Sequence, residues 1–257
     1  GGSKFNAKGG SVLDTIQHQG TKLALSVWFL AVYLLSQAKT GLSALALKRQ
    51  LGVSYPTAWL LHHKLMQAMA DRDAQYTLSG QVQIDDAYLG GEMPGGKAGR
   101  GSENKVSFVA AVSLDTEGHP LHAKLTPVSG FTHDAIAAWS KAHLSANCAV
   151  LSDGLACFSG VTKAGCRHEP LVVRGRKPKD LPEFRWVNTL LGNVKTSLSG
   201  AHHAFKFGKY ANRYLAAIAY RFNRRFQLKS LTGRLLVAAA TSKPRTEAWL
   251  RMAELPC

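Results

Sequence analysis

Two adjacent acids lie within an otherwise strand-like segment. The segment QVQIDDAYLGG, residues 81–91, has apolar or aromatic side chains at Val82, Ile84 and Tyr88 and ends in paired glycines. It therefore predicts a β-strand that runs into a turn. Asp85 and Asp86 lie in its middle, although acids are disfavoured inside strands. Because a carboxylate held away from water needs a partner or a metal ion, we expect a cation at this strand.

Two further polar residues have a similar setting. Asp153 follows the short apolar strand expected at Cys148–Leu151 and precedes a glycine. An acid at the end of a buried strand is often aimed into a site, and an ordinary turn is the alternative. Asn188 and Lys195 lie seven residues apart in a helix expected at Glu183–Ser199, so they share a face. Asn is a poor helix former, and a solvent-facing Asn is the alternative there.

The charge of the chain is large and unevenly distributed. The 257 residues can build one sizeable core and a small accessory domain, and the net charge is +16 with a pI near 9.9. Such a balance indicates a polyanionic partner, nucleic acid first and an anionic membrane second. Residues 77–159 carry five Lys/Arg against eight Asp/Glu, a net charge of −3. This acidic island suits a cation site surrounded by basic surfaces.

The cysteines and apolar segments exclude some classes of protein. The four cysteines form no CxxC pair, so we expect no zinc site and interpret them as reduced thiols of a cytoplasmic protein. The longest apolar run, Leu23–Leu35, is interrupted by Ser26. It is too short to cross a bilayer, which takes about 20 residues. The opening residues 1–20 are interpreted as a linker or tail.

Residues 22–72 predict a helix-turn-helix. We expect a buried helix at Ser26–Gln37, a short helix at Leu42–Leu51 and a third at Tyr55–Ala70, with Gly52 and Ser54 as caps. This pattern favours DNA binding, and a plain helical bundle is the alternative. The DNA contacts expected here are at Lys48, Arg49, Ser54, Tyr55, Thr57 and Lys64.

A glycine-rich loop follows the acidic strand. Gly90–Gly101 contains GEMPGGK, which matches most of a phosphate-binding loop, but Ala98 replaces the Ser/Thr and a strand rather than a helix follows. A basic hairpin loop that contacts DNA through Lys97, Arg100 and Lys105 is a better interpretation, and a mobile surface hairpin is the alternative. Strands are then expected at Lys105–Leu114 and His119–Val128, and a helix at Thr132–Ser145.

The last third of the chain is basic. The loop Val172–Asp180 is rich in arginine and lysine, and Lys206–Leu228 predicts one long helix with an apolar stripe and an exposed arginine ridge. Arginine suits phosphate because its fork donates two hydrogen bonds at once. The DNA contacts expected in this region are at Arg174, Arg176, Lys177, His203, Arg221, Arg224 and Arg225.

Several motifs together resemble one family. IDDAYLGG, SDG, WVNTLLGNVKTSLSG and YRFNRRF resemble bacterial insertion-sequence transposases with a D,D,E or D,D,N triad. The string KTGLSALALKRQLGVSYPTAWLLHHKLMQ resembles the branch that carries an N-terminal zinc ribbon before a helix-turn-helix. The match runs from about Thr21 to Leu235. No zinc ribbon is recognisable in this sequence, so we expect a chain that lacks this part of the family pattern.

The resemblance implies a fold and a set of metal ligands. The fold would be α/β, an RNase H-like mixed five-stranded sheet flanked by helices, preceded by a small all-α helix-turn-helix domain. The domains would span residues 21–76 and 77–235, with a helical tail at 236–257. The ligands would be Asp85, chosen over Asp86 by the family motif, with Asp153 and Asn188. Lys195 matches the basic residue that follows the third ligand in many such families.

The implied activity is DNA transposition. Two Mg²⁺ or Mn²⁺ ions would support cleavage at transposon ends and strand transfer into target DNA, and Asn in place of Glu predicts a more weakly held second ion. The implied partners are double-stranded DNA and at least a second copy of the chain, in the bacterial cytoplasm at the nucleoid. A catalytically silent DNA-binding protein and a metal-dependent nuclease without strand transfer are the alternatives.

Overall fold

Three helices form the front of the chain. The computed structural model describes residues 23–91, 102, 104–172, 181–202 and 205–252, and begins with α2 (Leu25–Gln37), α3 (Ala44–Leu51) and α4 (Tyr55–Asp73). The predicted caps are confirmed. Gly52 ends α3 with a φ of 66°, a conformation that suits glycine. Ser54 begins α4 by accepting a hydrogen bond from the Thr57 amide at 3.3 Å.

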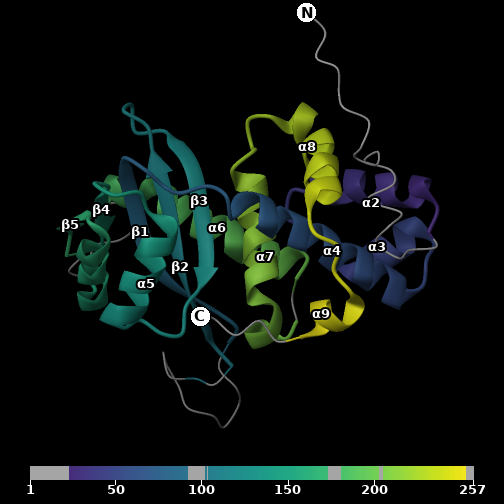
Figure 1. Ribbon diagram of the computed structural model, residues 1–257, viewed down its shortest axis with the longest axis horizontal. Coiled ribbons are helices and arrows are strands. Elements are labelled where there is room, and N and C mark those ends of the chain that lie inside the picture. Colours follow the sequence, from purple (N-terminus) through teal and green to yellow (C-terminus); the bar gives the residue numbers. More distant parts are fainter. Residues whose placement is uncertain (1–22, 92–101, 103, 173–180, 203–204, 253–257) are drawn as a thin grey trace, which may run out of the picture.

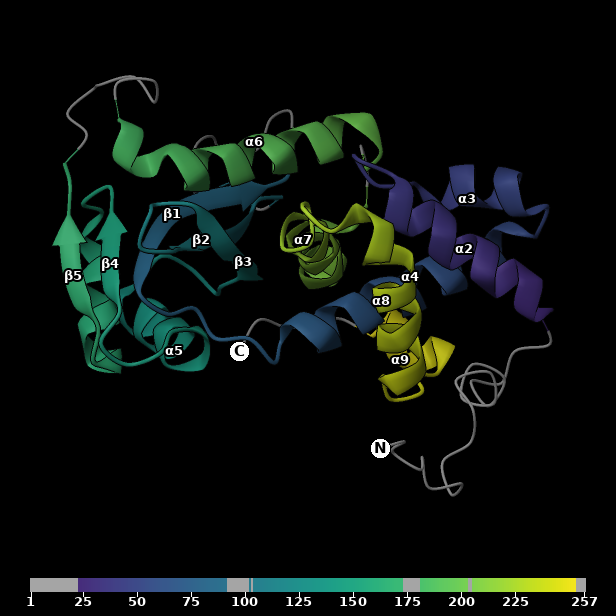
Figure 2. The same cartoon turned by 90° about the horizontal axis from the view of Figure 1, so that it is seen from above.

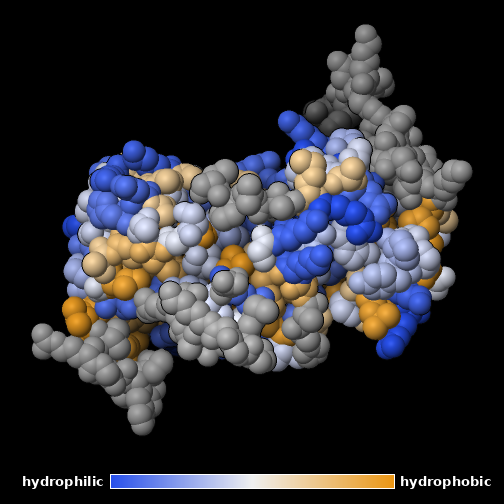
Figure 3. Space-filling view, turned by 90° about the horizontal axis from the view of Figure 1, so that it is seen from below, coloured by the Kyte–Doolittle hydropathy of each residue, from blue (hydrophilic) through white to orange (hydrophobic). Residues whose placement is uncertain are grey.

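The first of these helices differs from the expectation. The prediction of a helix buried all round is wrong for α2, because Phe29, Leu30 and Tyr33 are 40%, 43% and 53% exposed. Its other face, with Trp28 and Val32, is buried. Hydrophobic residues are accordingly visible at the end of the molecule that the front helices form (Figure 3).

A five-stranded mixed sheet forms the second part. Its strands are β1 (Gln81–Leu89), β2 (Val106–Leu114), β3 (Pro120–Pro127), β4 (Ala149–Ser152) and β5 (Arg167–Pro170), in the order β3-β2-β1-β4-β5. The first three strands form an antiparallel meander, and β4 and β5 run parallel to β1. This order and these directions are those of the RNase H-like fold, which confirms the predicted fold class.

Helices cover both faces of the sheet. On one face lie α5 (His133–His143) and the 3₁₀ helix η2 (Ala156–Ala164), which the sequence analysis did not anticipate. On the other face lie α6 (Arg185–Gly200), preceded by the 3₁₀ turn η4 (Pro182–Phe184), and α7 (Phe207–Phe222). Figure 1 and Figure 2 show α5 and α6 on opposite sides of the strands.

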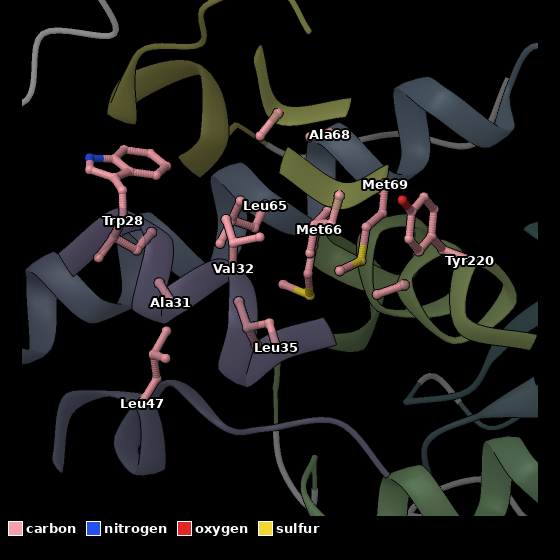
Figure 4. Close-up of a cluster of buried hydrophobic side chains, with 14 of the residues drawn as sticks. Trp28, Ala31, Val32, Leu35, Leu47, Leu65, Met66, Ala68, Met69 and Tyr220 are labelled. Carbon is pink, nitrogen blue, oxygen red and sulfur yellow. The ribbon is translucent and has the colours of Figure 1, made fainter. Parts of the chain in front are cut away.

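The front helices share a hydrophobic core with the end of the chain. Side chains of α2, α3 and α4 pack with those of α7 and of α8 (Leu228–Thr241) in one cluster (Figure 4). Leu65 and Leu235, for example, are both 0% exposed. The three front helices are therefore joined by packing to the helices that follow the sheet. The domain boundaries drawn from the sequence remain predictions.

The expectation of one long C-terminal helix is wrong. The helix ends at Phe222, a new helix begins at Leu228, and α9 (Glu247–Arg251) follows. Just after α7, the Asn223 side chain accepts a hydrogen bond from the Ala123 amide at 2.7 Å and donates one to Asp73 at 2.9 Å. These contacts tie the turn between α7 and α8 to β3 and to the end of α4.

The expected arginine ridge is not exposed. Arg213 is 0% and Arg224 5% exposed. Arg213 donates to Gln67 and to the Leu250 carbonyl. Arg224 forms an ion pair with Asp73, with 2.7 Å between Nη2 and Oδ1. The predicted DNA contact of Arg224 is therefore wrong, because its guanidinium holds the end of α4 against α7.

Three consecutive residues of α4 are buried. His62 is 2%, His63 0% and Lys64 9% exposed, so the histidines are not surface residues and the predicted DNA contact of Lys64 is wrong. The His63 ring stacks on Trp59 with 4.0 Å between centroids. Burial, with the charges of Arg213 and Arg251, lowers the pKa of His63 to about 3, and burial lowers the pKa of His62 well below its usual value.

Across the residues that the structure describes, none of the helices combines the length and the apolar character that crossing a bilayer requires.

We predict that the buried histidines make the protein acid-sensitive. The unfolded chain takes up protons near pH 6.5 while the folded chain keeps His63 neutral down to about pH 3. The contribution of neutral His63 to the free energy of unfolding is thus complete above pH 6.5 and is lost as the pH falls towards 3. Between pH 7 and pH 5, His63 alone should account for a loss of about 2 kcal/mol in the free energy of unfolding.

Urea denaturation at the two pH values measures this loss. His63→Phe keeps an aromatic ring against Trp59 and should make the free energy of unfolding less dependent on pH. The exposed His119→Phe serves as the control and should retain the full dependence. An equal pH dependence in all three proteins would contradict the prediction.

Candidate active site

Three carboxylates converge where β1 and β4 lie side by side. Asp85 and Asp86 lie in the middle of β1, and Asp153 directly follows β4. The parallel register pairs Gln83 with Leu151, so continuing it by two residues sets Asp153 beside Asp85. One oxygen from each of Asp85, Asp86 and Asp153 lies within 4.8 Å of the others. Strand pairing thus brings together acids that are far apart in the sequence.

The chemistry of this cluster is that of a hard-cation site. Two ionised carboxylates at this separation repel each other by about 3 kcal/mol at an effective dielectric constant of about 20. All three acids are only half-exposed, so water screens the repulsion incompletely. Carboxylate oxygens are the ligands that Mg²⁺ and Mn²⁺ prefer, and the donor set fits such an ion.

Local hydrogen bonds orient two of these carboxylates. Asp85 Oδ1 accepts from the Asp86 amide at 2.9 Å, and Asp153 Oδ1 accepts from the Leu155 amide at 3.0 Å. Gly154, which lies between Asp153 and Leu155, has a φ of 86°, which suits glycine rather than a residue with a side chain. The turn after β4 therefore folds back on the carboxylate that it positions.

The neighbours of Asp85 in the strand show which face it occupies. Val82 and Ile84 pack in the cluster that contains α5, whereas Ala87 and Leu89 pack in the cluster that contains α6. Because side chains alternate along a strand, Asp85 belongs to the α6 face. Asp86 belongs to the α5 face. The sequence pattern could not make this distinction.

Gln83 joins the active-site strand to α6 and was missed by the sequence analysis. Its side chain is 4% exposed. It accepts from the amides of Trp186 and Val187 at 3.1 and 3.0 Å and donates to the Glu183 carbonyl. Gln83 therefore binds the start of α6 to β1 at a point two residues before Asp85. A polar residue between two apolar ones in a predicted strand was the available signal.

Asn188 and Lys195 lie on this fixed helix. Asn188 directly follows Val187 and is half-exposed, and Lys195 is exposed two turns further on. Figure 2 shows α6 running over the strand that carries the acids. The predicted third ligand, Asn188, thus lies near the end of α6 that Gln83 binds to β1.

The predicted DNA-contacting residues fall into three groups. Lys48, Arg49, Ser54 and Tyr55 are exposed at the end of α3 and the start of α4, while Thr57 and Lys105 are half-buried. Arg225 donates to the Phe222 and Pro120 carbonyls. Lys64 and Arg224 are buried, as described above, and Arg221 is half-buried. Six further predicted contacts lie outside the described residues: Lys97, Arg100, Arg174, Arg176, Lys177 and His203.

The fold and the acidic cluster define an RNase H-like protein with a candidate site for divalent cations. The model of the ISXO2-like transposase domain matches residues 77–223. This match covers more than half of the chain, so the chain belongs to the ISXO2-like transposase family. The resemblance inferred from the motifs is confirmed.

Two other comparisons add little. No curated protein matches the chain. A solved structure described as "Crystal structure of a pre-cleavage Mos1 transpososome" is similar over 94% of this chain and 83% of that one, with 10% identity and a TM-score of 0.25. The fold assignment rests on the order and directions of the strands.

We predict that the cluster binds Mn²⁺ through Asp85 and Asp153. Asp85→Asn and Asp153→Asn each keep the side-chain size and remove one charge, so each should weaken Mn²⁺ binding at least tenfold, about 1.4 kcal/mol. Isothermal titration calorimetry measures the affinity. The control is Glu169→Gln on β5, which should bind Mn²⁺ as the unchanged protein does. An unchanged affinity in Asp85→Asn would contradict the assignment.

Gln83 should contribute substantially to stability. Gln83→Leu removes three hydrogen bonds and leaves buried polar groups unpaired, so we predict a loss of about 2 kcal/mol in the free energy of unfolding. Urea denaturation measures the loss. Gln81→Leu makes the same change at an exposed position of the same strand and should have little effect. Equal stabilities of the two variants would contradict the proposed role of Gln83.

Proposed function

We propose that the chain is a divalent-metal-dependent transposase that cleaves DNA at transposon ends and joins the cut end to target DNA. The observation that carries the proposal is the convergence of the Asp85 and Asp153 carboxylates at the β1–β4 junction of a chain from a transposase family. The carboxylate chemistry supports a cation-dependent reaction. The family supports DNA as the substrate.

The proposed ligands are Asp85, Asp153 and the amide oxygen of Asn188. Asp85 faces α6, and Gln83 fixes the start of that helix next to Asp85, which supports Asn188 as the third ligand. Asp86 presents a third carboxylate from the other face of the strand, and its backbone amide donates to Asp85 Oδ1. Two bound Mg²⁺ or Mn²⁺ ions would activate the attacking water or 3′-hydroxyl and stabilise the leaving oxygen. Asn188 contributes no charge, so the second ion would be held more weakly.

The residues around the site would hold the DNA. Lys195 lies two turns after Asn188 on the same face of α6 and would contact a phosphate near the scissile bond. The exposed residues Lys48 and Arg49, with Ser54 and Tyr55 at the start of α4, support binding through the helix-turn-helix. The net charge of +16 suits a polyanion. The other basic residues predicted from the sequence, except Lys64 and Arg224, would add phosphate contacts.

We further propose that the chain works as a homodimer or larger assembly on DNA, in the bacterial cytoplasm at the nucleoid. Pairing two transposon ends requires at least two binding surfaces. The family is the support for this assembly.

The test is an assay with labelled DNA carrying the terminal repeats that flank the coding sequence, Mg²⁺ and a target plasmid. We predict cleavage and joining by the unchanged chain. Asn188→Ala should lower the rate at least a hundredfold, and Asp85→Ala should abolish chemistry while DNA binding is retained. The exposed Asp134→Ala should react as the unchanged chain does.

The outcomes separate the competing functions. DNA binding without cleavage would indicate a catalytically silent DNA-binding protein. Cleavage without joining would indicate a nuclease. Full activity of Asp85→Ala would contradict the assignment of the first ligand.

A further inference from the structure

A cationic pocket lies outside the carboxylate cluster. It is formed where the end of α2 and the turn after it meet α6, α7 and the start of α8, and its volume is about 370 Å³. The polar residues that line it include Gln37, Lys39, Asn193, Thr196, Arg221 and Arg225. None of the described residues that line this pocket is an acid. The lining thus combines three cationic side chains and hydrogen-bond donors with the apolar side chains of Ile218, Phe222, Leu228 and Leu231.

Arg221 is the most unusual residue of this pocket. Its Nε and Nη2 atoms are buried and have no hydrogen-bond partner among the described residues. Burial lowers the pKa of Arg221 to about 10, so the side chain is still charged at neutral pH. An unpaired buried charge is strongly destabilising. No described acid is close enough to offset this cost, and an anion in the pocket would supply the missing negative charge.

The surroundings hold this guanidinium in place. A side chain added at Gly41, which has a φ of 92°, would lie 3.2 Å from Arg221 Nη2 and 2.6 Å from His202 Nε2. The turn after α2 therefore approaches the guanidinium closely enough to restrict it. By contrast, Arg224, three residues further along the chain and just after α7, is paired with Asp73. Arg221 is thus preorganised and still lacks a counter-ion.

We propose that this pocket binds a phosphate group, and that in the DNA complex its occupant is a phosphate of the DNA backbone. A guanidinium fork matches phosphate oxygens, and Lys39 and Arg225 add two further positive charges to the lining. The pocket volume accommodates a tetrahedral oxyanion. The part of the proposal that names DNA rests on the proposed function.

The position of the pocket suits a strand that passes the active site. Asn188 and Thr196 are eight residues apart on α6, about 12 Å along the helix axis. The pocket also includes Lys39 and Thr40, which lie between α2 and the helix-turn-helix pair α3 and α4. A phosphate held here would contact both the helix that carries Asn188 and the front helices. The bound phosphate would thereby fix how DNA lies across α6 and the front helices.

The first experiment measures phosphate binding by the DNA-free protein. Inorganic phosphate is titrated at constant ionic strength, and the melting temperature is followed. At ten times the dissociation constant we expect a rise of about 3 °C for the unchanged chain. The rise should disappear in Arg221→Gln and persist in Arg167→Gln, an exposed arginine on β5 that serves as the control. An equal rise in Arg221→Gln would overturn the proposal.

Stability without phosphate separates a binding role from a structural one. Arg221→Gln removes an unpaired buried charge, so its melting temperature in chloride should equal or exceed that of the unchanged chain. A lower melting temperature together with an unchanged phosphate effect would show that Arg221 is structural and would overturn the proposal. If Arg221→Gln does not fold, Lys39→Gln changes an exposed residue of the same pocket. It should weaken the phosphate effect, and an unchanged effect would overturn the proposal.

The second experiment identifies the source of the phosphate. Binding of a double-stranded oligonucleotide is measured by fluorescence anisotropy over a range of salt concentrations in EDTA, which prevents cleavage. Arg221→Gln should reduce the slope of log K against log salt by about 1, and Arg167→Gln should not. A lost phosphate effect with an unchanged slope would support a free phosphate ion and overturn DNA as the occupant. Neither experiment requires catalysis, so failure of the phosphate-binding proposal is distinguishable from failure of the proposed transposase activity.

Discussion

The mutual repulsion of carboxylates at the β1–β4 junction is the constraint on which the rest of the structure depends. Parallel pairing of these strands brings Asp153 beside Asp85, and the oxygens of three acids lie within 4.8 Å of one another. A sheet would not retain such an arrangement for stability, since like charges in a half-buried setting oppose folding. The cluster is understandable as a site completed by a cation, and the acidic segment in a chain of net charge +16 has the same explanation.

The other elements hold this cluster in a defined relation to basic surfaces. Gln83 fixes α6 to the strand that carries Asp85, and α6 covers the same face of the sheet. The front helices pack in one core with α7 and α8, and the Asp73–Arg224 ion pair joins α4 to the end of α7. The Arg221 pocket lies where these parts meet. The proposed metal site and the proposed DNA contacts would therefore be organised by the same few helices.

Local signals in the sequence predicted the features that local physics determines. Gly52 and Ser54 marked helix ends, the alternating pattern at Gln81–Leu89 marked a strand, and the IDDAYLGG motif marked the acids. Contacts between distant segments were not predictable in this way. Arg224 pairs with Asp73 across 151 positions, and Asn223, just after α7, accepts a hydrogen bond from the Ala123 amide. A pattern of charge along a helix cannot show whether its arginines face water or a buried acid. His62 and His63 were likewise buried by α7, which follows far later in the chain.

Anomalous diffraction from crystals grown with Mn²⁺ tests the central claim most directly. The account predicts anomalous density bounded by Asp85, Asp153 and Asn188, with ligand distances suited to oxygen donors. A second, weaker peak would correspond to the ion that the neutral Asn188 holds less tightly. Mn²⁺ bound elsewhere on the chain, with no density at these three residues, would contradict the account.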